Sequence, residues 1–137
     1  MGCDIHLYFE KKNKEGTWEK IEIDDRLLPD DRDYELFAFL ADVRNGKQLE
    51  SPFANRGLPT DRSISGDDHD ETLWLGDHSF TYAYLDEILK APWEKSGLQY
   101  CYFHLFCLSI LPRLMNRCGF FLREEMRNIR VIMGFDS

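Results

Sequence analysis

The residues best suited to chemistry near the start of the chain are Asp4 and His6, which are separated by one residue. They lie in residues 3–10, where apolar and polar residues alternate as in a β-strand with one buried face. The polar face of this strand would carry Asp4, His6, Tyr8 and Glu10. A carboxylate beside an imidazole can bind a divalent metal ion or act as an acid–base pair. The strand therefore predicts a small polar site.

Two further motifs place a histidine next to an acid: Asp68-His69-Asp70 and Asp77-His78. Divalent ions bind neutral imidazole and carboxylate groups, so the simplest metal hypothesis uses Asp4, His6, Asp77 and His78. The same residues suggest an acid–base site made of His6, His78 and Asp4. The alternative is chance, because 25 acids in 137 residues place one near most histidines. For His69, in an acidic stretch, a solvated loop is the favoured interpretation.

Arginine residues supply the second part of the predicted site. Arg56 opens Arg56-Gly57-Leu58-Pro59, a rigid turn that would project a bidentate anion donor. Arg130 and Tyr8 are further candidates for ligand binding. If the first and last strands pair, Arg130 and Asp136 would lie toward the face that carries Asp4 and His6. Arg44 and Arg62 are interpreted instead as exposed turn residues.

Cys101, His104 and Cys107 are spaced by three residues and could be drawn as a metal patch on one helix face. Their neighbours are mostly large and apolar, and buried free cysteines are common packing residues. The sequence therefore favours a structural role for this trio.

The composition excludes several classes of protein. A length of 137 residues predicts one domain, residues 1–137, and 43% hydrophobic residues are sufficient for a core. The net charge of −8 argues against general binding to nucleic acids or to anionic membranes. The four cysteines have no disulfide-scaffold spacing, and no apolar stretch is long enough to span a bilayer. These features predict a reduced, soluble, cytoplasmic protein.

The patterning predicts strands over residues 3–10, 17–23, 79–84 and 129–135, and helices over residues 34–44, 85–90 and 98–117. The first helix would end at Asn45-Gly46, and the last would be kinked near Pro112. Residues 47–78 have the irregular composition of a long functional loop. We expect an α+β fold: a small antiparallel sheet that includes the N-terminal hairpin and the C-terminal strand, with helices on one face.

Several segments, in order along the chain, resemble a family of small uncharacterised phage and prophage proteins that open with Met-Gly-Cys-Asp-Ile-His. They are Met1-Gly2-Cys3-Asp4-Ile5-His6, Tyr34-Glu35-Leu36-Phe37, Asp42-Val43-Arg44-Asn45, Arg56-Gly57-Leu58-Pro59, His78-Ser79, Leu111-Pro112-x-Leu114, Arg130-Val131 and Phe135-Asp136. The resemblance implies a phage-encoded accessory protein made in the cytoplasm of a bacterial host. It implies no particular activity.

Three functions fit these observations. The first is a metal-assisted hydrolase or phosphodiesterase that cleaves a nucleotide-type small molecule, such as a signal of host defence. The second is a binding protein that encloses such a nucleotide without cleaving it, by arginine and by stacking on the aromatic residues Tyr8, Trp74, Phe80 and Tyr82. A homo-oligomer could form that site between protomers. The third is a host-interaction protein without a small-molecule site.

Overall fold

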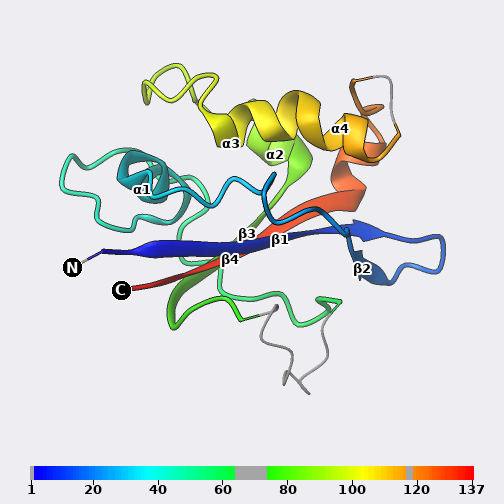
Figure 1. Cartoon of the computed structure of the whole chain (residues 1–137), viewed down its shortest axis with the longest axis horizontal. Coiled ribbons are helices and arrows are strands. Elements are labelled where there is room, and N and C mark those ends of the chain that lie inside the picture. The colour runs from blue at the N-terminus through cyan, green and yellow to red at the C-terminus, as the bar shows by residue number, and fades with distance from the viewer. Residues whose placement is uncertain (1, 64–73, 117–118) are drawn as a thin grey trace.

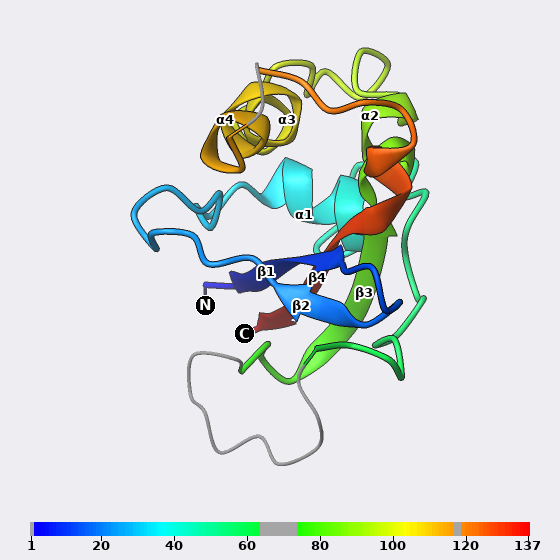
Figure 2. The same ribbon diagram turned by 90° about the vertical axis from the view of Figure 1, so that its right-hand side faces the viewer.

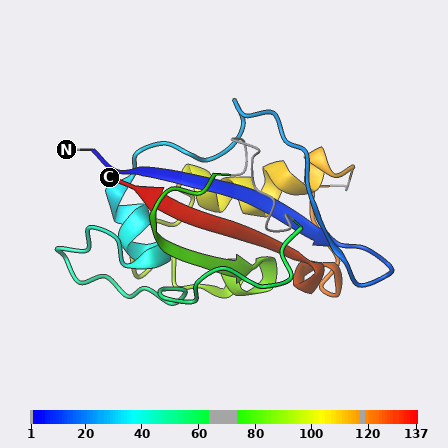
Figure 3. The same cartoon turned by 90° about the horizontal axis from the view of Figure 1, so that it is seen from below.

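The computed structural model describes residues 2–63, 74–116 and 119–137. Its centre is a four-stranded antiparallel sheet with the order β2-β1-β4-β3. The strands are β1 (Asp4–Lys12), β2 (Trp18–Lys20), β3 (His78–Tyr84) and β4 (Ile129–Asp136). Figure 3 shows β1, β4 and β3 side by side, with the first and last strands of the chain adjacent. The expected α+β class and the pairing of the terminal strands are confirmed.

The helices lie on one face of this sheet, which we call the helix-covered face (Figures 1 and 2). They are α1 (Tyr34–Ala41), α2 (Leu85–Lys90) and a continuous helical run of α3 (Tyr102–Leu105), the π-helix η2 (Phe106–Ile110) and α4 (Leu111–Leu114). A short 3-10 helix, η3 (Glu125–Asn128), leads into β4. The main core fills the space between helices and sheet, and every odd-numbered residue of β4 belongs to it.

Helix α1 is buried on nearly all sides, since Leu36 to Ala41 are all buried. The Asp33 side chain caps its start by accepting a hydrogen bond from the Leu36 N–H. The helix ends earlier than expected, because Asp42 adopts the left-handed conformation at φ 58° and terminates it. Aspartate tolerates this conformation, so the stop does not need the later Asn45-Gly46.

The long C-terminal helix starts at Tyr102, later than the expected residue 98, and changes its winding where Pro112 approaches. Proline has no N–H, and its ring collides with the carbonyl four residues earlier in a regular α-helix. The wider π turn over Phe106–Ile110 immediately precedes Leu111 and Pro112. The expected kink is therefore accommodated by a π-helical segment.

The second face of the sheet is partly covered as well. The chain leading into β3 crosses below the sheet in the view of Figure 1. Gly57 donates its N–H to the Phe80 carbonyl at the edge of β3, and Ser63 donates to the Glu10 side chain on β1. Between these two points lies a small apolar cluster: Tyr8, Leu75 and Ile132, with Leu58, Phe80 and Tyr82 against it.

Two glycines allow the chain to cross the end of β4. A side chain at Gly134 would collide with the Leu75 carbonyl and the Phe80 ring. One at Gly76, which has φ +84°, would collide with the Phe135 carbonyl. The sheet thereby accepts residues 75–77 at close range, and this crossing brings Trp74 to His6.

Strand β2 is shorter than the sequence pattern predicts. Strand β2 covers only three residues, Trp18–Lys20, where the pattern predicted residues 17–23. None of the helices in the described part of the chain has the length and apolar composition needed to cross a bilayer.

Candidate functional site

The second face carries two polar clusters on the same pair of strands. The Glu10 cluster consists of Tyr8, Glu10, Trp18, Asp61, Ser63 and Arg130. The His6 cluster consists of Asp4, His6, Arg32, Trp74 and Asp136. Each includes one ion pair between β1 and β4: Arg130 with Glu10, directly opposite in the register, and His6 with Asp136.

The ion pair at the centre of the Glu10 cluster is closed to solvent, although Asp61 at its rim is exposed. Arg130 donates from Nε to Glu10 Oε1 at 2.7 Å, and their side chains are 1% and 0% exposed. Arg130 Nη1 lies 3.0 Å from Asp61 Oδ1, and the Trp18 ring centroid lies 3.8 Å from the Arg130 guanidinium carbon. The Ser63 N–H donates to Glu10 Oε2 at 2.5 Å. The loop residues Asp61 and Ser63 therefore bind the ion pair and cover it.

Burial shapes the electrostatics of this cluster. Burial, and secondarily the nearby Glu10 carboxylate, raise the pKa of Tyr8 to about 12. For Arg130, burial is the largest single influence and opposes the charged form, but the hydrogen bond to Glu10, the charge of Glu10 and the hydrogen bonds to Asp61 and Tyr84 together outweigh it and raise the pKa. Tyr8 Oη, Ser63 Oγ and Arg130 Nη2 are buried and have no hydrogen-bond partner among the residues that the structure describes. Tyr8 and Arg130, predicted as ligand-binding residues, are therefore buried and inaccessible to a ligand in this structure.

The His6 cluster is open to solvent. His6 Nε2 lies 3.0 Å from Asp136 Oδ2, and the two side chains are 29% and 26% exposed. The Trp74 ring packs against the imidazole at 4.8 Å between centroids and is itself 54% exposed. A hydrogen bond on one edge and a ring on its surface fix the imidazole in place on a rigid strand.

Asp4 is held by an arginine that the sequence analysis did not single out. Arg32 donates from Nε to Asp4 Oδ1 at 2.6 Å and from Nη2 to Asp4 Oδ2 at 3.2 Å. This hydrogen-bonded pair lowers the pKa of Asp4. Gly2 makes room for the arrangement, because a side chain there would collide with the Arg32 guanidinium. Asp4 is therefore occupied by an arginine and does not hydrogen-bond to His6.

The hydrogen bond to Asp136 determines what His6 can do. When Nε2 carries the proton that Asp136 accepts, the lone pair of the neutral ring is on Nδ1. No hydrogen-bond partner of Nδ1 is found among the described residues. An imidazole oriented in this way by a carboxylate can act as a general base or as a metal ligand.

His78 does not join His6. It pairs with Phe135 in the sheet and stacks near that ring at 6.4 Å, which places it on the helix-covered side. His6 lies on the second face, two strands away, and adjacent strands are about 4.8 Å apart. His78 Nε2 instead lies 2.8 Å from Ser137 Oγ. Side chains on opposite faces of a sheet cannot share one ion.

The structure therefore does not bring together the four residues of the predicted metal site, Asp4, His6, Asp77 and His78. Asp77 is exposed and donates its backbone N–H to the Phe135 carbonyl. Across residues 2–63, 74–116 and 119–137, no three His, Cys, Asp or Glu side chains are grouped closely enough to hold an ion. His69 lies outside the described residues.

Arg56 is engaged by the chain itself. Its Nη1 and Nη2 donate to Glu87 Oε1 and Oε2 at 2.7 and 2.6 Å, and Nη1 also donates to the Tyr82 carbonyl. The Phe53 and Tyr82 rings lie 5.3 and 5.7 Å from its guanidinium carbon. This hydrogen bonding lowers the pKa of Glu87. The predicted anion-binding fork therefore binds the carboxylate of Glu87.

The structural interpretation of His104 is confirmed. Its ring is stacked between Trp93 and Tyr100 at 4.7 and 5.6 Å, and Nδ1 accepts the Tyr100 N–H. Burial lowers the pKa of this histidine, and Cys107 nearby in the helix is fully buried. The trio packs the core.

The sequence signals for the rest of the His6 cluster were uneven. Asp136 was expected on the same face as His6 from the alternation of the last strand, and Trp74 was an aromatic candidate for ligand stacking. Arg32 had no signal, because it lies in an acidic connector without periodicity. Its role depends on how that connector folds back toward the start of β1.

Comparison with known proteins adds no assignment: no family model, curated protein or solved structure matches the chain. The site must therefore be interpreted from its own geometry.

Proposed function

We propose that the protein is a hydrolase of a small nucleotide-type anion and that His6 is its acid–base residue. The observation that carries the proposal is the oriented, partly exposed imidazole, held by Asp136 at 3.0 Å and packed against Trp74. Both anchors lie on the rigid sheet or on the segment that crosses it, which suits a group that must transfer protons in a fixed direction.

The neighbouring residues suit a substrate with a ring and a negative charge. Trp74 offers an exposed aromatic surface on which a base can stack. Arg32 is the exposed cation of the cluster, and a phosphate would compete with Asp4 for its guanidinium. His6 Nδ1 would then accept a proton from water as it attacks phosphorus, and the protonated ring would return it to the leaving oxygen. A divalent ion bound to Nδ1 would be another way to activate that water. The biological setting, cleavage of a bacterial defence signal, rests on the resemblance alone.

The second candidate is a binding protein that holds the same ligand intact. It is favoured by the pairing at the site, because Asp4 is bonded to Arg32 and Asp136 to His6. Those contacts engage both acids and leave the exposed Trp74 ring for stacking, and binding of this kind requires no proton transfer.

One experiment distinguishes the hydrolase from the binding protein. The purified protein, with and without added Mg²⁺, Mn²⁺ or Zn²⁺, is incubated with cyclic nucleotides and ADP-ribose, and products are followed by ³¹P NMR. We expect His6→Gln to reduce turnover by about 10²–10⁴-fold, the usual contribution of a general base. His78→Gln is the matched control, since that histidine lies on the opposite side, and it should keep full turnover.

If a nucleotide raises the melting temperature of the protein and is recovered uncleaved, the hydrolase proposal is wrong and the binding-protein proposal is supported. Equal loss of turnover in both histidine variants would remove His6 as the specific base. The absence of both turnover and binding with every nucleotide would overturn both candidates and favour a protein-interaction role.

A further inference from the structure

A pocket of about 410 Å³ lies between α2 and residues 121–127, on the helix-covered side of the sheet, and we call it the α2 pocket. Figure 2 shows α2 beside the segment that leads into β4, and α2 packs against η3 in that segment. The pocket precedes β4, whereas Asp136, the partner of His6, is the last residue of β4. A strand rises about 3.3 Å per residue, so roughly 20 Å separates the pocket from the His6 cluster.

The α2 wall of the pocket is fixed by contacts on its other sides. Glu87 accepts hydrogen bonds from both Nη atoms of Arg56 and from the Tyr84 N–H. The Trp93 indole N–H donates to the Ile88 carbonyl at 2.6 Å, and Ile88 is fully buried. The helix therefore holds the pocket in shape before any ligand arrives, which lowers the cost of binding.

The charge on the α2 pocket is opposite in sign to that of the whole protein. Three cations, Lys90, Arg123 and Arg127, line it with one acid, Asp86, although the chain has a net charge of −8. Arg127 Nε lies 3.4 Å from Asp86 Oδ2, so one cation is paired with the acid across the two walls. The side chains of Lys90 and Arg123 have no ion-pair or hydrogen-bond partner in the part of the chain that the structure describes. The local excess is two positive charges.

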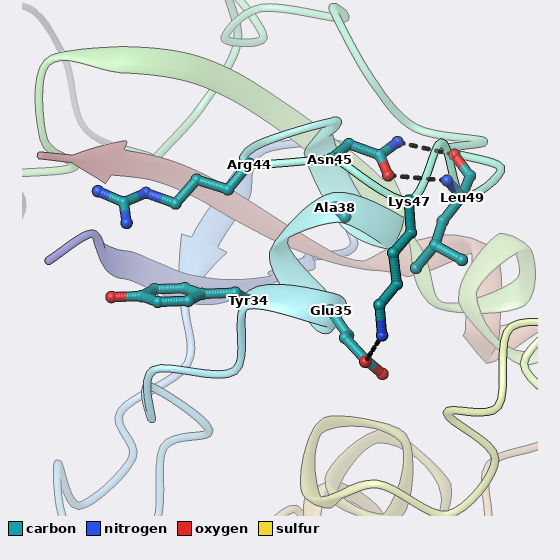
Figure 4. Close-up of a pocket in the computed structure, with 8 residues that line it drawn as sticks. Tyr34, Glu35, Ala38, Arg44, Asn45, Lys47 and Leu49 are labelled. Atoms are coloured by element: carbon teal, nitrogen blue, oxygen red, sulfur yellow. Dashed lines mark hydrogen bonds and ion pairs between the residues drawn. The ribbon is translucent and has the colours of Figure 1, made fainter.

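Other acids do not offset this excess within the pocket. Glu124 and Glu125, which follow Arg123 in the sequence, do not belong to the lining. The smaller pocket beside α1 differs in this respect, because its Lys47 lies 2.6 Å from Glu35 (Figure 4). The α2 pocket therefore presents two cations to a ligand, and a dianion is the complementary occupant.

The apolar part of the lining defines the rest of the ligand. Phe121 is a buried core residue, and Leu89 and Met126 pack against the main core. The volume lies within the roughly 300–1,000 Å³ of small-molecule sites. We propose that the α2 pocket binds a small organic dianion, such as a phosphate monoester, with its apolar body on these three side chains and its charged end at Lys90 and Arg123.

The test measures binding of 1-naphthyl phosphate to the full chain by NMR titration at about pH 7.5, where the probe is a dianion because the second phosphate pKa is about 6. The monoanion 1-naphthoate and the neutral 1-naphthol carry the same ring. We expect a dissociation constant on the order of 0.1–1 mM for the phosphate, with naphthol at least about tenfold weaker and naphthoate between them. The amide signals that shift should be those of residues 89–90 and 121–127.

Two substitutions remove the cations at exposed positions. Lys90→Gln and Arg123→Gln should each weaken binding of the phosphate about three- to tenfold, and the double variant should weaken it more than about tenfold. Lys47→Gln is the matched control, because it removes an exposed lysine from the pocket beside α1. This control should bind the phosphate as the parent protein does.

Three results would overturn the proposal: no saturable binding of the phosphate by the parent protein, parent-like binding by a double variant that keeps its native spectrum, or naphthol binding as tightly as the phosphate. If the double variant does not fold, the two single variants decide in its place. His6→Gln should bind the phosphate normally and show the same shifted amides. Failure of this pocket and failure of the hydrolase proposal are therefore distinguishable.

Discussion

The Glu10 cluster and the His6 cluster occupy the same face of the same two strands, yet they differ in almost every physical property. Each contains an acid on one strand and a cationic or basic group on the other. Glu10 and Arg130 are 0% and 1% exposed, whereas His6 and Asp136 are 29% and 26% exposed. The difference shows that cross-strand polar pairing alone does not mark a site, because the covering loop decides which pair a ligand can reach.

The largest expected effect comes from breaking the buried pair. Arg130→Met leaves Glu10 charged, buried and without its main partner, and such changes cost about 3–5 kcal/mol. We expect urea denaturation to show a fall of that size in the free energy of unfolding. The double variant Glu10→Leu/Arg130→Met should recover much of it, since no uncompensated Glu10 carboxylate remains.

If Arg130→Met does not fold, recovery of a folded protein by the double variant carries the same information. A loss below about 1 kcal/mol in the single variant would contradict a structural role for the pair, because that is the range of exposed ion pairs.

The second effect concerns the same cluster and is pH-dependent. The folded-state pKa of Tyr8 is raised from 10.0 to about 12. A raised pKa means that the folded state holds the proton more tightly. Its contribution to stability is therefore complete below pH 10 and is lost as the pH rises toward 12. A shift of this size corresponds to roughly 2–3 kcal/mol.

Tyr8→Phe provides the matched control, because it removes the phenol and keeps the ring. Thermal or urea unfolding at pH 8, 10 and 11.5 should show a steeper loss of stability for the parent than for the variant. At pH 8 the variant should be about as stable as the parent, since the lost hydroxyl has no hydrogen-bond partner among the described residues. If the stability of the parent and of Tyr8→Phe fell in parallel as the pH rises, a raised pKa of Tyr8 would not be the cause of the loss.

The smallest expected effect on stability comes from the open cluster. Asp136→Asn weakens a partly exposed pair, and such pairs contribute about 0–1 kcal/mol. We expect the free energy of unfolding to change by less than about 1 kcal/mol while turnover, if His6 is the base, falls at least tenfold because the ring loses its orienting carboxylate. A stability loss as large as that of Arg130→Met would erase the distinction between the two clusters.

The sequence predicted much of the scaffold. Strict alternation in residues 3–10 and 129–135 defined two strands and their buried faces, and both are found. It also predicted helix α1, although Asp42 ends that helix before the expected Asn45-Gly46. Boundaries were less accurate because a left-handed cap depends on local hydrogen bonds that composition does not reveal.

The candidate site was predicted only in part. The sequence indicated that His6 is a residue suited to acid–base or metal chemistry. It also indicated that Asp136 lies on the same face of the sheet as His6. It could not indicate that His78 is turned to the other side of the sheet, since the irregular register between His78 and Thr81 arises from pairing with β4. Nor could it indicate that Arg56 binds Glu87, which is 31 residues away in the sequence.

What the sequence determined by itself is the periodicity, and with it which side chains share a face, because the alternation of a strand is a local property of its backbone. What the tertiary structure decided is which of those side chains water and ligands can reach. That choice depends on where residues 57–63 and 74–77 cross the second face, and on Gly76 and Gly134, which permit one of those crossings. Burial depends on contacts between segments far apart in the chain, so one strand holds both a locked ion pair and an accessible imidazole.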